Sequence, residues 1–141
     1  MLKIPTSELM EKLLKANNIS EYVKENEDYF IDLTISEFLN EYIKAKKLTK
    51  SKIIKEAQIN EIYGYQIFSG SRIPSRSKLL ALCIAMKMTL EETQLTLKTA
   101  GFATLYPKNK WDSIVIRGIC DSSDILKINN DLYENGENTL D

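Results

Sequence analysis

Apolar residues recur at three- and four-residue spacing along most of this chain, and no stretch alternates with the two-residue period of a β-strand. Hydroxyl and asparagine residues stand before several of these apolar runs and glycines stand after them, as is typical of helix starts and stops. The pattern therefore predicts an all-α fold. A length of 141 residues with 43% hydrophobic residues fits one compact domain with shorter appendages.

The most organised part of the pattern lies in residues 48–79, which predict two short helices, a tight turn between them and a loop into a third helix. The apolar positions of the pair are Ile53, Ile54, Ala57, Ile59, Ile62, Tyr63 and Ile67. The residues expected to begin or end these helices are Thr49, Asn60, Gly70, Pro74 and Ser75. We expect the first helix of the pair to stop near Gln58.

The residue spacing of this stretch resembles, without any gap, that of the XRE-type helix-turn-helix. This is the class of phage repressors and Cro proteins. The positions that carry the resemblance are Leu48, Thr49, Ile53, Ile59, Asn60, Ile67, Gly70, Pro74 and Ser75. It covers roughly residues 36 to 100. The resemblance implies a five-helix repressor-like core, double-stranded DNA as the partner, and residues 61–69 as a recognition helix in the major groove.

The chain departs from the family pattern in the sizes of two residues. The pattern has a small residue, usually Ala, on the first helix of the pair and a β-branched or Leu-like residue on the second, whereas this chain has Ile54 and Gly64. Because helices that cross closely need one small side chain at the contact, we predict that Gly64 leaves the space that Ile54 fills. Gln58 also replaces the turn glycine, and Phe68 stands where the family usually has Glu.

The resemblance also implies which residues contact DNA. Those expected at base edges are Asn60, Glu61, Ile62, Tyr65 and Gln66. Those expected at phosphates are Lys50, Lys52, Ser71, Arg72, Arg76 and Lys78. Gln66 suits bidentate recognition of adenine, whereas Glu61 could accept from cytosine and Ile62 could touch a thymine methyl group. In the alternative interpretation, the tyrosines at 63 and 65 pack internally or form a surface for a protein partner.

Charge is distributed unevenly along the chain. The net charge is only -1, but residues 44–87 hold ten Lys and Arg against Glu56 and Glu61, which leaves +8 on this segment and -9 on the rest. A basic module between acidic ends is the pattern expected when one part of a protein touches phosphates. The alternative is a solvated lysine face without a partner.

Composition argues against several kinds of chemistry. The chain has no histidine, no CxxC, no Gly-rich phosphate loop and no nucleophile elbow, so we predict neither an enzyme nor a metal or cofactor site. Cys83 and Cys120 are expected to be small buried hydrophobic residues. No signal peptide and no run of 18 apolar residues is present, which predicts a cytoplasmic protein without membrane contact.

Three regions are predicted. Residues 1–34 form an acidic N-terminal helical arm packed on the core, residues 35–101 the helix-turn-helix domain, and residues 102–141 a C-terminal helical extension with an acidic tail. In the arm, we expect a helix over 6–16, a second helix from Ile19 and an apolar patch at 29–33. Further helices are expected from Ser36, over 75–87, from Thr89 to Gly101, from Trp111 to 118–121, and after Ser122 or Ser123.

The sequence leaves two functions open. The first is a DNA-binding transcriptional regulator, and the second is a non-catalytic protein-interaction adaptor on the same scaffold. Both terminal regions carry more apolar residues than a core of about 65 residues needs. We therefore expect at least one of them to form a homodimer interface or to bind a protein partner, and the other to pack on its own core.

Overall fold

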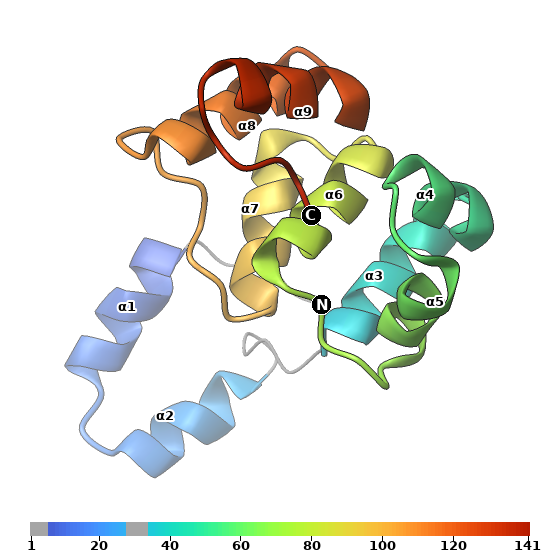
Figure 1. Cartoon of the computed structure of the whole chain (residues 1–141). Helices are drawn as coiled ribbons and strands as arrows, with labels where there is room; N and C mark the ends of the chain where they lie inside the picture. The colour runs from blue at the N-terminus through green and yellow to red at the C-terminus, as the bar shows by residue number, and fades with distance from the viewer. Residues whose placement is uncertain (1–5, 28–33) are drawn as a thin grey trace. The chain divides into compact units, whose positions relative to one another are not determined.

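The computed structural model describes residues 6–27 and 34–141, and all regular structure in these ranges is helical (Figure 1). The helices are α1 (Thr6–Lys15), α2 (Ile19–Glu25), α3 (Ile35–Lys46), α4 (Lys50–Glu56), α5 (Glu61–Ser69), α6 (Arg76–Ala85), α7 (Leu90–Thr99), α8 (Lys110–Cys120) and α9 (Ile125–Glu134). The predicted all-α fold is therefore confirmed. The apolar patch expected at 29–33 lies outside the described residues.

The chain divides into two compact units, Met1–Asp32 and Leu33–Asp141. The first unit contains α1 and α2, and the second contains α3 to α9. The predicted extension over residues 102–141 lies within the second unit. The three predicted regions, and the packing of the N-terminal arm on the core, stay predictions.

Most helices begin at side chains suited to that position. Asn60 and Ser75 accept hydrogen bonds from backbone N–H groups in the first turns of α5 and α6. Thr89 and Glu92 form a reciprocal capping box at the start of α7. Thr49 occupies the capping position of α4, but its side chain makes no capping hydrogen bond. Gly70 ends α5 in a left-handed conformation with a φ of 86°, as the pattern predicts.

The expected start of α3 at Ser36 is wrong by one residue. α3 begins at Ile35, and Thr34 caps it by accepting from a backbone N–H. Ser36 instead donates its hydroxyl to the carbonyl oxygen of Phe68, at 2.7 Å. Its side chain therefore joins α3 to α5 and does not cap a helix.

The expected start of the last helix is also wrong. Asp124 caps α9 by accepting from the N–H of Lys127, and neither Ser122 nor Ser123 takes this role. Ser122 has a φ of 57°, the left-handed region, because it lies in the turn that closes α8. Its backbone N–H donates to the carbonyl of Ile119, within α8.

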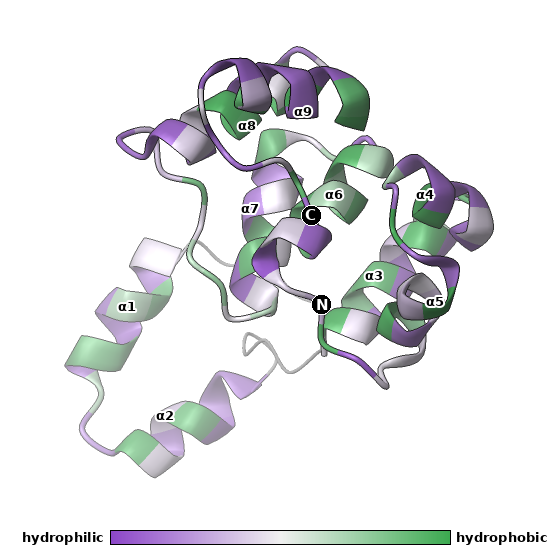
Figure 2. Ribbon diagram, viewed as in Figure 1, coloured by the Kyte–Doolittle hydropathy of each residue, from purple (hydrophilic) through white to green (hydrophobic). Residues whose placement is uncertain are grey.

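The second unit has one continuous apolar core to which α3 through α9 all contribute. α6 lies at its centre, because every residue from Leu79 to Ala85 is buried, which confirms the prediction from its apolar composition on all sides. Val115 of α8 and Ile128 and Leu132 of α9 are fully buried in the same core. Figure 2 shows hydrophobic stretches in α6, α8 and α9. A separate core made by α3 to α7 stays a prediction.

The two cysteines occupy different environments. Cys83 is buried in α6, where burial raises the pKa of its thiol to about 12. Cys120 is exposed in the last turn of α8, so its expected burial is wrong. The apolar stripe of α8 that faces the core ends at Ile119, and a residue one position further along a helix points about 100° away.

Candidate nucleic-acid interface

The helix pair α4–α5 crosses at the two residues whose sizes depart from the family pattern. A Cβ atom added to Gly64 would lie 2.6 to 2.9 Å from three side-chain atoms of Ile54, closer than Cβ atoms approach their neighbours. Both residues are buried. The prediction that Gly64 leaves the space that Ile54 fills is therefore confirmed.

The turn between the two helices is closed without a glycine. Gln58 adopts a left-handed conformation with a φ of 57°, and its N–H donates to the carbonyl of Lys55. Ile59, which follows it, is buried and donates its N–H to the carbonyl of Ile54. Gln58 thus takes the conformation that a turn glycine favours, at a cost on the order of 1 kcal/mol.

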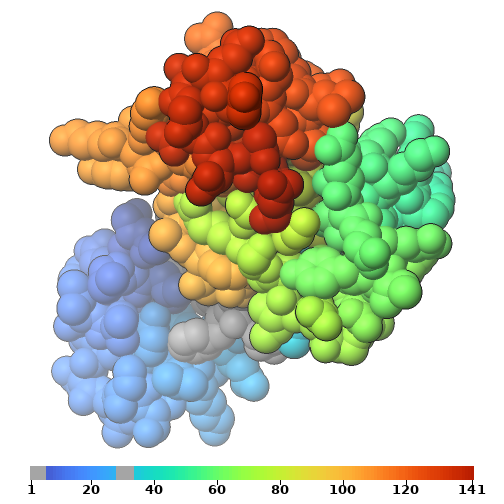
Figure 3. Space-filling model, in the orientation of Figure 1, coloured from blue at the N-terminus to red at the C-terminus, as the bar shows by residue number. Residues whose placement is uncertain are grey.

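One face of α5 is open to solvent. Glu61, Ile62 and Tyr65 are exposed, Ile62 to 71%, while Gln66 is half-buried and Asn60 is exposed at the helix start. The helix carries no Lys or Arg. Figure 3 shows the region of α4 and α5 at the surface of the second unit. The five residues predicted to contact bases therefore lie at accessible positions at the start and along one side of α5.

The opposite face of α5 is held by the core and by α3. Phe68 is buried, and its carbonyl oxygen accepts from Ser36 Oγ and from Asn40 Nδ2, each at 2.7 Å. These bonds satisfy a carbonyl at the C-terminal end of α5, where helical partners are missing. Sequence reasoning missed Ser36 and Asn40 as supports of α5, because they lie about 30 residues away and only their spacing of four on α3 links them.

The loop after α5 brings three predicted contact residues together. Arg72 Nε donates to Gln66 Oε1 at 3.1 Å, and the Arg72 backbone N–H donates to the Gln66 carbonyl at 3.2 Å. The Arg72 guanidinium lies 5.1 Å from the centre of the Tyr63 ring, which favours a cation–π contact. The Ser71 hydroxyl is 3.4 Å from the Gln66 carbonyl oxygen.

This arrangement alters what Gln66 offers to a base. Bidentate recognition of adenine needs the amide oxygen as an acceptor and the amide nitrogen as a donor. The Gln66 oxygen already accepts from Arg72. Gln66 and Arg72 together therefore present N–H donors to the solvent while this bond holds.

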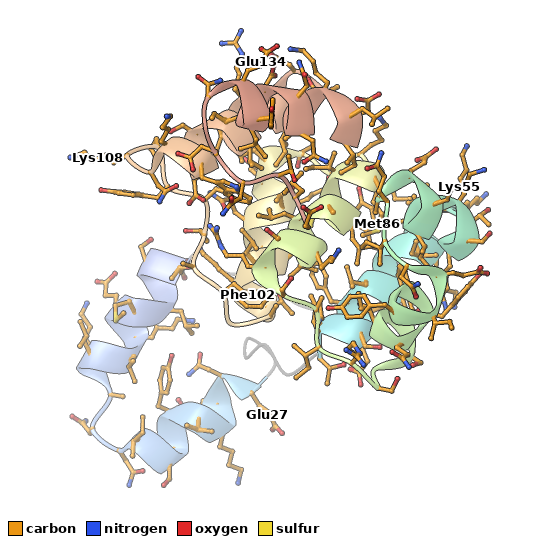
Figure 4. The ribbon with its side chains drawn as sticks, viewed as in Figure 1. Glu27, Lys55, Met86, Phe102, Lys108 and Glu134 are labelled. Atoms are coloured by element: carbon orange, nitrogen blue, oxygen red, sulfur yellow. The ribbon has the colours of Figure 1, made fainter. Side chains whose placement is uncertain are left out.

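The remaining basic candidates lie on α4 and α6. Lys50 lies at the start of α4, with its ammonium nitrogen 5.6 Å from the centre of the Phe68 ring. Lys52 lines an open groove that is also bordered by Lys87 at the end of α6 and Asp124 at the start of α9. Lys55 borders the same groove and projects outward in Figure 4. Lys78 is half-buried in the first turn of α6.

Arg76 is engaged within the fold. Its Nη1 and Nη2 atoms donate to the two carboxylate oxygens of Asp112, each at 3.0 Å, and it also donates to the carbonyls of Ala103 and Thr104. Asp112 is buried and accepts a further bond from the Tyr106 backbone N–H. Arg76 therefore fastens α8 and the preceding loop to α6. In the sequence, the one sign of this ion pair is Asp112, an acidic residue at a position within the apolar stripe of α8.

Tyr42 of α3 has its pKa raised to about 12, first by burial and then by the nearby carboxylate of Glu92. Among the described residues, no three of the types His, Cys, Asp and Glu gather where they could hold a metal ion. Within residues 6–27 and 34–141, no helix has the length and apolar composition needed to cross a membrane.

The protein is all-α, and the buried contact between Ile54 of α4 and Gly64 of α5 holds α5 with one face open to solvent. Comparison of the chain with protein-family models, with curated proteins and with solved structures found no match in any of the three. The resemblance to XRE proteins therefore depends on the residue pattern alone.

Proposed function

We propose that this protein is a DNA-binding transcriptional regulator of the XRE type, which places α5 in the major groove of double-stranded DNA. The observation that carries the proposal is the open face of α5, which is held in place by Ile54 against Gly64 and by the bonds from α3 to Phe68. In this proposal the protein acts in the cytoplasm as a homodimer, because a two-fold protein matches two half-sites.

Charge supports the proposal. Segment 44–87 carries +8 in a chain of net charge -1, and most of its basic side chains are exposed. The exposed ones are Lys44, Lys46, Lys47, Lys52, Lys55, Arg72 and Lys87. Lys50, Lys52, Ser71, Arg72 and Lys78 are retained as the proposed phosphate contacts. Arg76 is left out, because its guanidinium is paired with Asp112.

One observation favours the second candidate, a protein-interaction adaptor. The surface around α5 exposes Ile62, Tyr65 and, in the following loop, Ile73. Aromatic and aliphatic side chains at the centre of a surface are typical of protein interfaces, and α5 itself offers no Lys or Arg to a phosphate-lined groove. A partner that binds here would be a protein with a complementary apolar patch.

DNA binding by this surface predicts a defined salt dependence. Lys50→Ala should weaken binding about equally on all duplex sequences, and Lys50→Ala and Arg72→Ala should each lower the salt slope by roughly one unit, because each removes one phosphate contact. Fluorescence anisotropy with a labelled random duplex over a series of salt concentrations measures both effects. Lys98→Ala, an exposed lysine on α7, is the matched control and should leave the slope unchanged. Unchanged binding in both test variants would favour the adaptor.

The bond between Gln66 and Arg72 predicts a base preference. A pair that presents donors should select guanine, whose N7 and O6 atoms both accept, at the contacted position. Arg72→Ala frees the Gln66 oxygen and should shift the preference toward adenine by roughly 5- to 100-fold, the range of one bidentate contact. Selection of bound duplexes from a random library, followed by sequencing, reads this shift. Adenine selected equally by both proteins would contradict the arrangement.

A further inference from the structure

The unit formed by α1 and α2 leaves most of its apolar side chains in contact with water. No residue of α1 is buried, and Tyr22 is the one buried apolar residue among those described in this unit. Met10 is 52% exposed, Leu14 is 77% exposed and Ile19 is 61% exposed. Figure 2 shows hydrophobic stretches along both helices.

Most apolar side chains of the hairpin border one open apolar groove, which Leu14 does not line. Leu9, Met10 and Leu13 line it from α1, and Ile19, Tyr22 and Val23 line it from α2, around an open cavity of about 350 Å³. The lining is almost entirely apolar. Helices of ten and seven residues are marginal in water on their own, so covering this groove would stabilise the hairpin.

The other end of the chain differs in this respect. Val115 and Leu132 are fully buried, and Trp111 and Ile114 are packed against the core of their own unit. The apolar stripes of α8 and α9 are therefore covered within their own unit. The sequence had left open whether these stripes pack on the core or form an interface. Of the two terminal regions, the hairpin α1–α2 is the one whose described residues leave an apolar groove open.

We propose that the occupant of this groove is the same hairpin of a second copy of this chain, so that α1 and α2 of two copies form a four-helix bundle. A two-fold axis sets the same surface of each copy against the other, which places groove against groove. The exposed parts of the five exposed large apolar side chains of the hairpin, Met10, Leu13, Leu14, Ile19 and Val23, amount to roughly 500 Å² a copy. If all of this surface is covered in both copies, the pair buries about 1,000 Å², the size at which specific interfaces begin.

Charge favours a second copy over a partner of one charge sign. The last turn of α1 is basic, with Lys12 and with Lys15, which also pairs with Glu11, whereas α2 carries Glu21 and Glu25 against Lys24. A second groove, on which the two signs face each other, is bordered by Lys12, Lys15, Glu21 and Glu25. A two-fold bundle that sets α1 beside α2 of the other copy brings opposite charges together on both sides. A uniformly basic or acidic partner meets repulsion on one of the two helices.

Static light scattering of the full chain, without DNA, tests the proposal. At tens of micromolar, the expected molar mass is twice 16.2 kDa. Met10→Glu combined with Val23→Glu should raise the dimer dissociation constant at least about 100-fold, because both side chains line the groove. Leu126→Glu, at an exposed apolar position on α9, is the matched control and should remain dimeric. A monomeric full chain, or a dimer that persists in the Met10 and Val23 variant, would overturn the proposal.

A charge exchange tests the same surface without altering any apolar residue. The variant Lys12→Glu, Lys15→Glu has a predominantly acidic hairpin in which Lys24 is the remaining base of the two helices, and the variant Glu21→Lys, Glu25→Lys has a predominantly basic one. Each alone should be largely monomeric, and an equimolar mixture should form a one-to-one dimer. A mixture that stays monomeric would contradict the self-pairing of the hairpins.

If the proposed DNA-binding function holds, the bundle also supplies the dimer that this function needs, because it joins two copies of α5 for two half-sites. The two ideas fail separately. A dimer that dissociates in the groove variant but does not bind duplex DNA supports the bundle and contradicts the DNA-binding regulator. A monomer that binds DNA does the reverse.

Discussion

Replacing Asp112 with alanine is expected to destabilise the second unit by roughly 2 to 4 kcal/mol. The carboxylate accepts two hydrogen bonds from Arg76 and one from the Tyr106 backbone, so its removal leaves these donors without their partner. Loss of one member of a fully buried ion pair costs about 3 to 5 kcal/mol. The Arg76 side chain is 26% exposed, and water can partly replace Asp112, which lowers the expected value.

Urea unfolding followed by circular dichroism measures this loss. Asp131→Ala is the matched control, because Asp131 pairs with Lys127 on the solvent side of α9, and it should change the unfolding free energy little. A double-mutant cycle with Arg76→Ala isolates the contribution of the pair. The loss of unfolding free energy in the double variant should be smaller than the sum of the two single losses. Equal, additive losses would contradict the fastening role of the pair.

The same variants bear on DNA. If Arg76 acts within the fold, Arg76→Ala lowers stability, and DNA binding at low temperature changes little as long as the chain stays folded. If Arg76 contacts phosphate, the salt slope falls by roughly one unit. The two readouts therefore separate a structural arginine from a phosphate contact at one position.

Replacing Gly64 with leucine is expected to destabilise the protein by about 3 kcal/mol, the upper part of the range for overpacked cores. Even a methyl group at this position meets Ile54 atoms at 2.6 to 2.9 Å, and the longer side chain must displace α4 or α5. Ile54→Ala alone removes those atoms and leaves a cavity, at a cost of roughly 2 to 5 kcal/mol. The double variant restores the size pattern of the XRE class and should recover much of both losses.

The measurement is again the free energy of unfolding, now over a cycle of four proteins. The loss in the double variant should be smaller than the sum of the two single losses by about 2 kcal/mol or more. Gly64→Leu combined with Ile53→Ala is the matched control: Ile53 is equally buried on α4, but none of the three atoms nearest to the position belongs to it. Gly64→Ala, the smaller change, serves if the leucine variant does not fold. Additive losses in the Ile54 pair would contradict the size exchange.

A second close contact of this kind joins α8 and α9. Gly118 lies inside α8, and a Cβ atom on it would overlap the side chain of Ile128. The sequence pattern places Gly118 near a helix end, where glycine is common, and offers no sign that it faces Ile128 across a helix crossing. Only the packing of α8 on α9 distinguishes these two roles of glycine.

The sequence by itself determined the features that depend on residues three or four positions apart. Asn60, Ser75 and Thr89 begin helices because their side chains bond to backbone N–H groups in the following turn. The burial of α6 follows from apolar residues on all its sides. The match of Gly64 to Ile54 was also predictable, because a known spacing supplied the helix crossing and the two sizes were exchanged across it.

Only the tertiary structure decided which side chains meet across longer separations. Arg76 and Asp112 are 36 residues apart, and Ser36 reaches the carbonyl of Phe68 across 32. The residue pattern predicts a basic side chain at a helix start for Arg76. The partner of Arg76 depends on how α8 packs relative to α6. The bond from Arg72 to Gln66 likewise depends on the path of the loop after Gly70. Local patterns form each helix, and packing of the assembled helices selects which polar groups remain free to bind a partner.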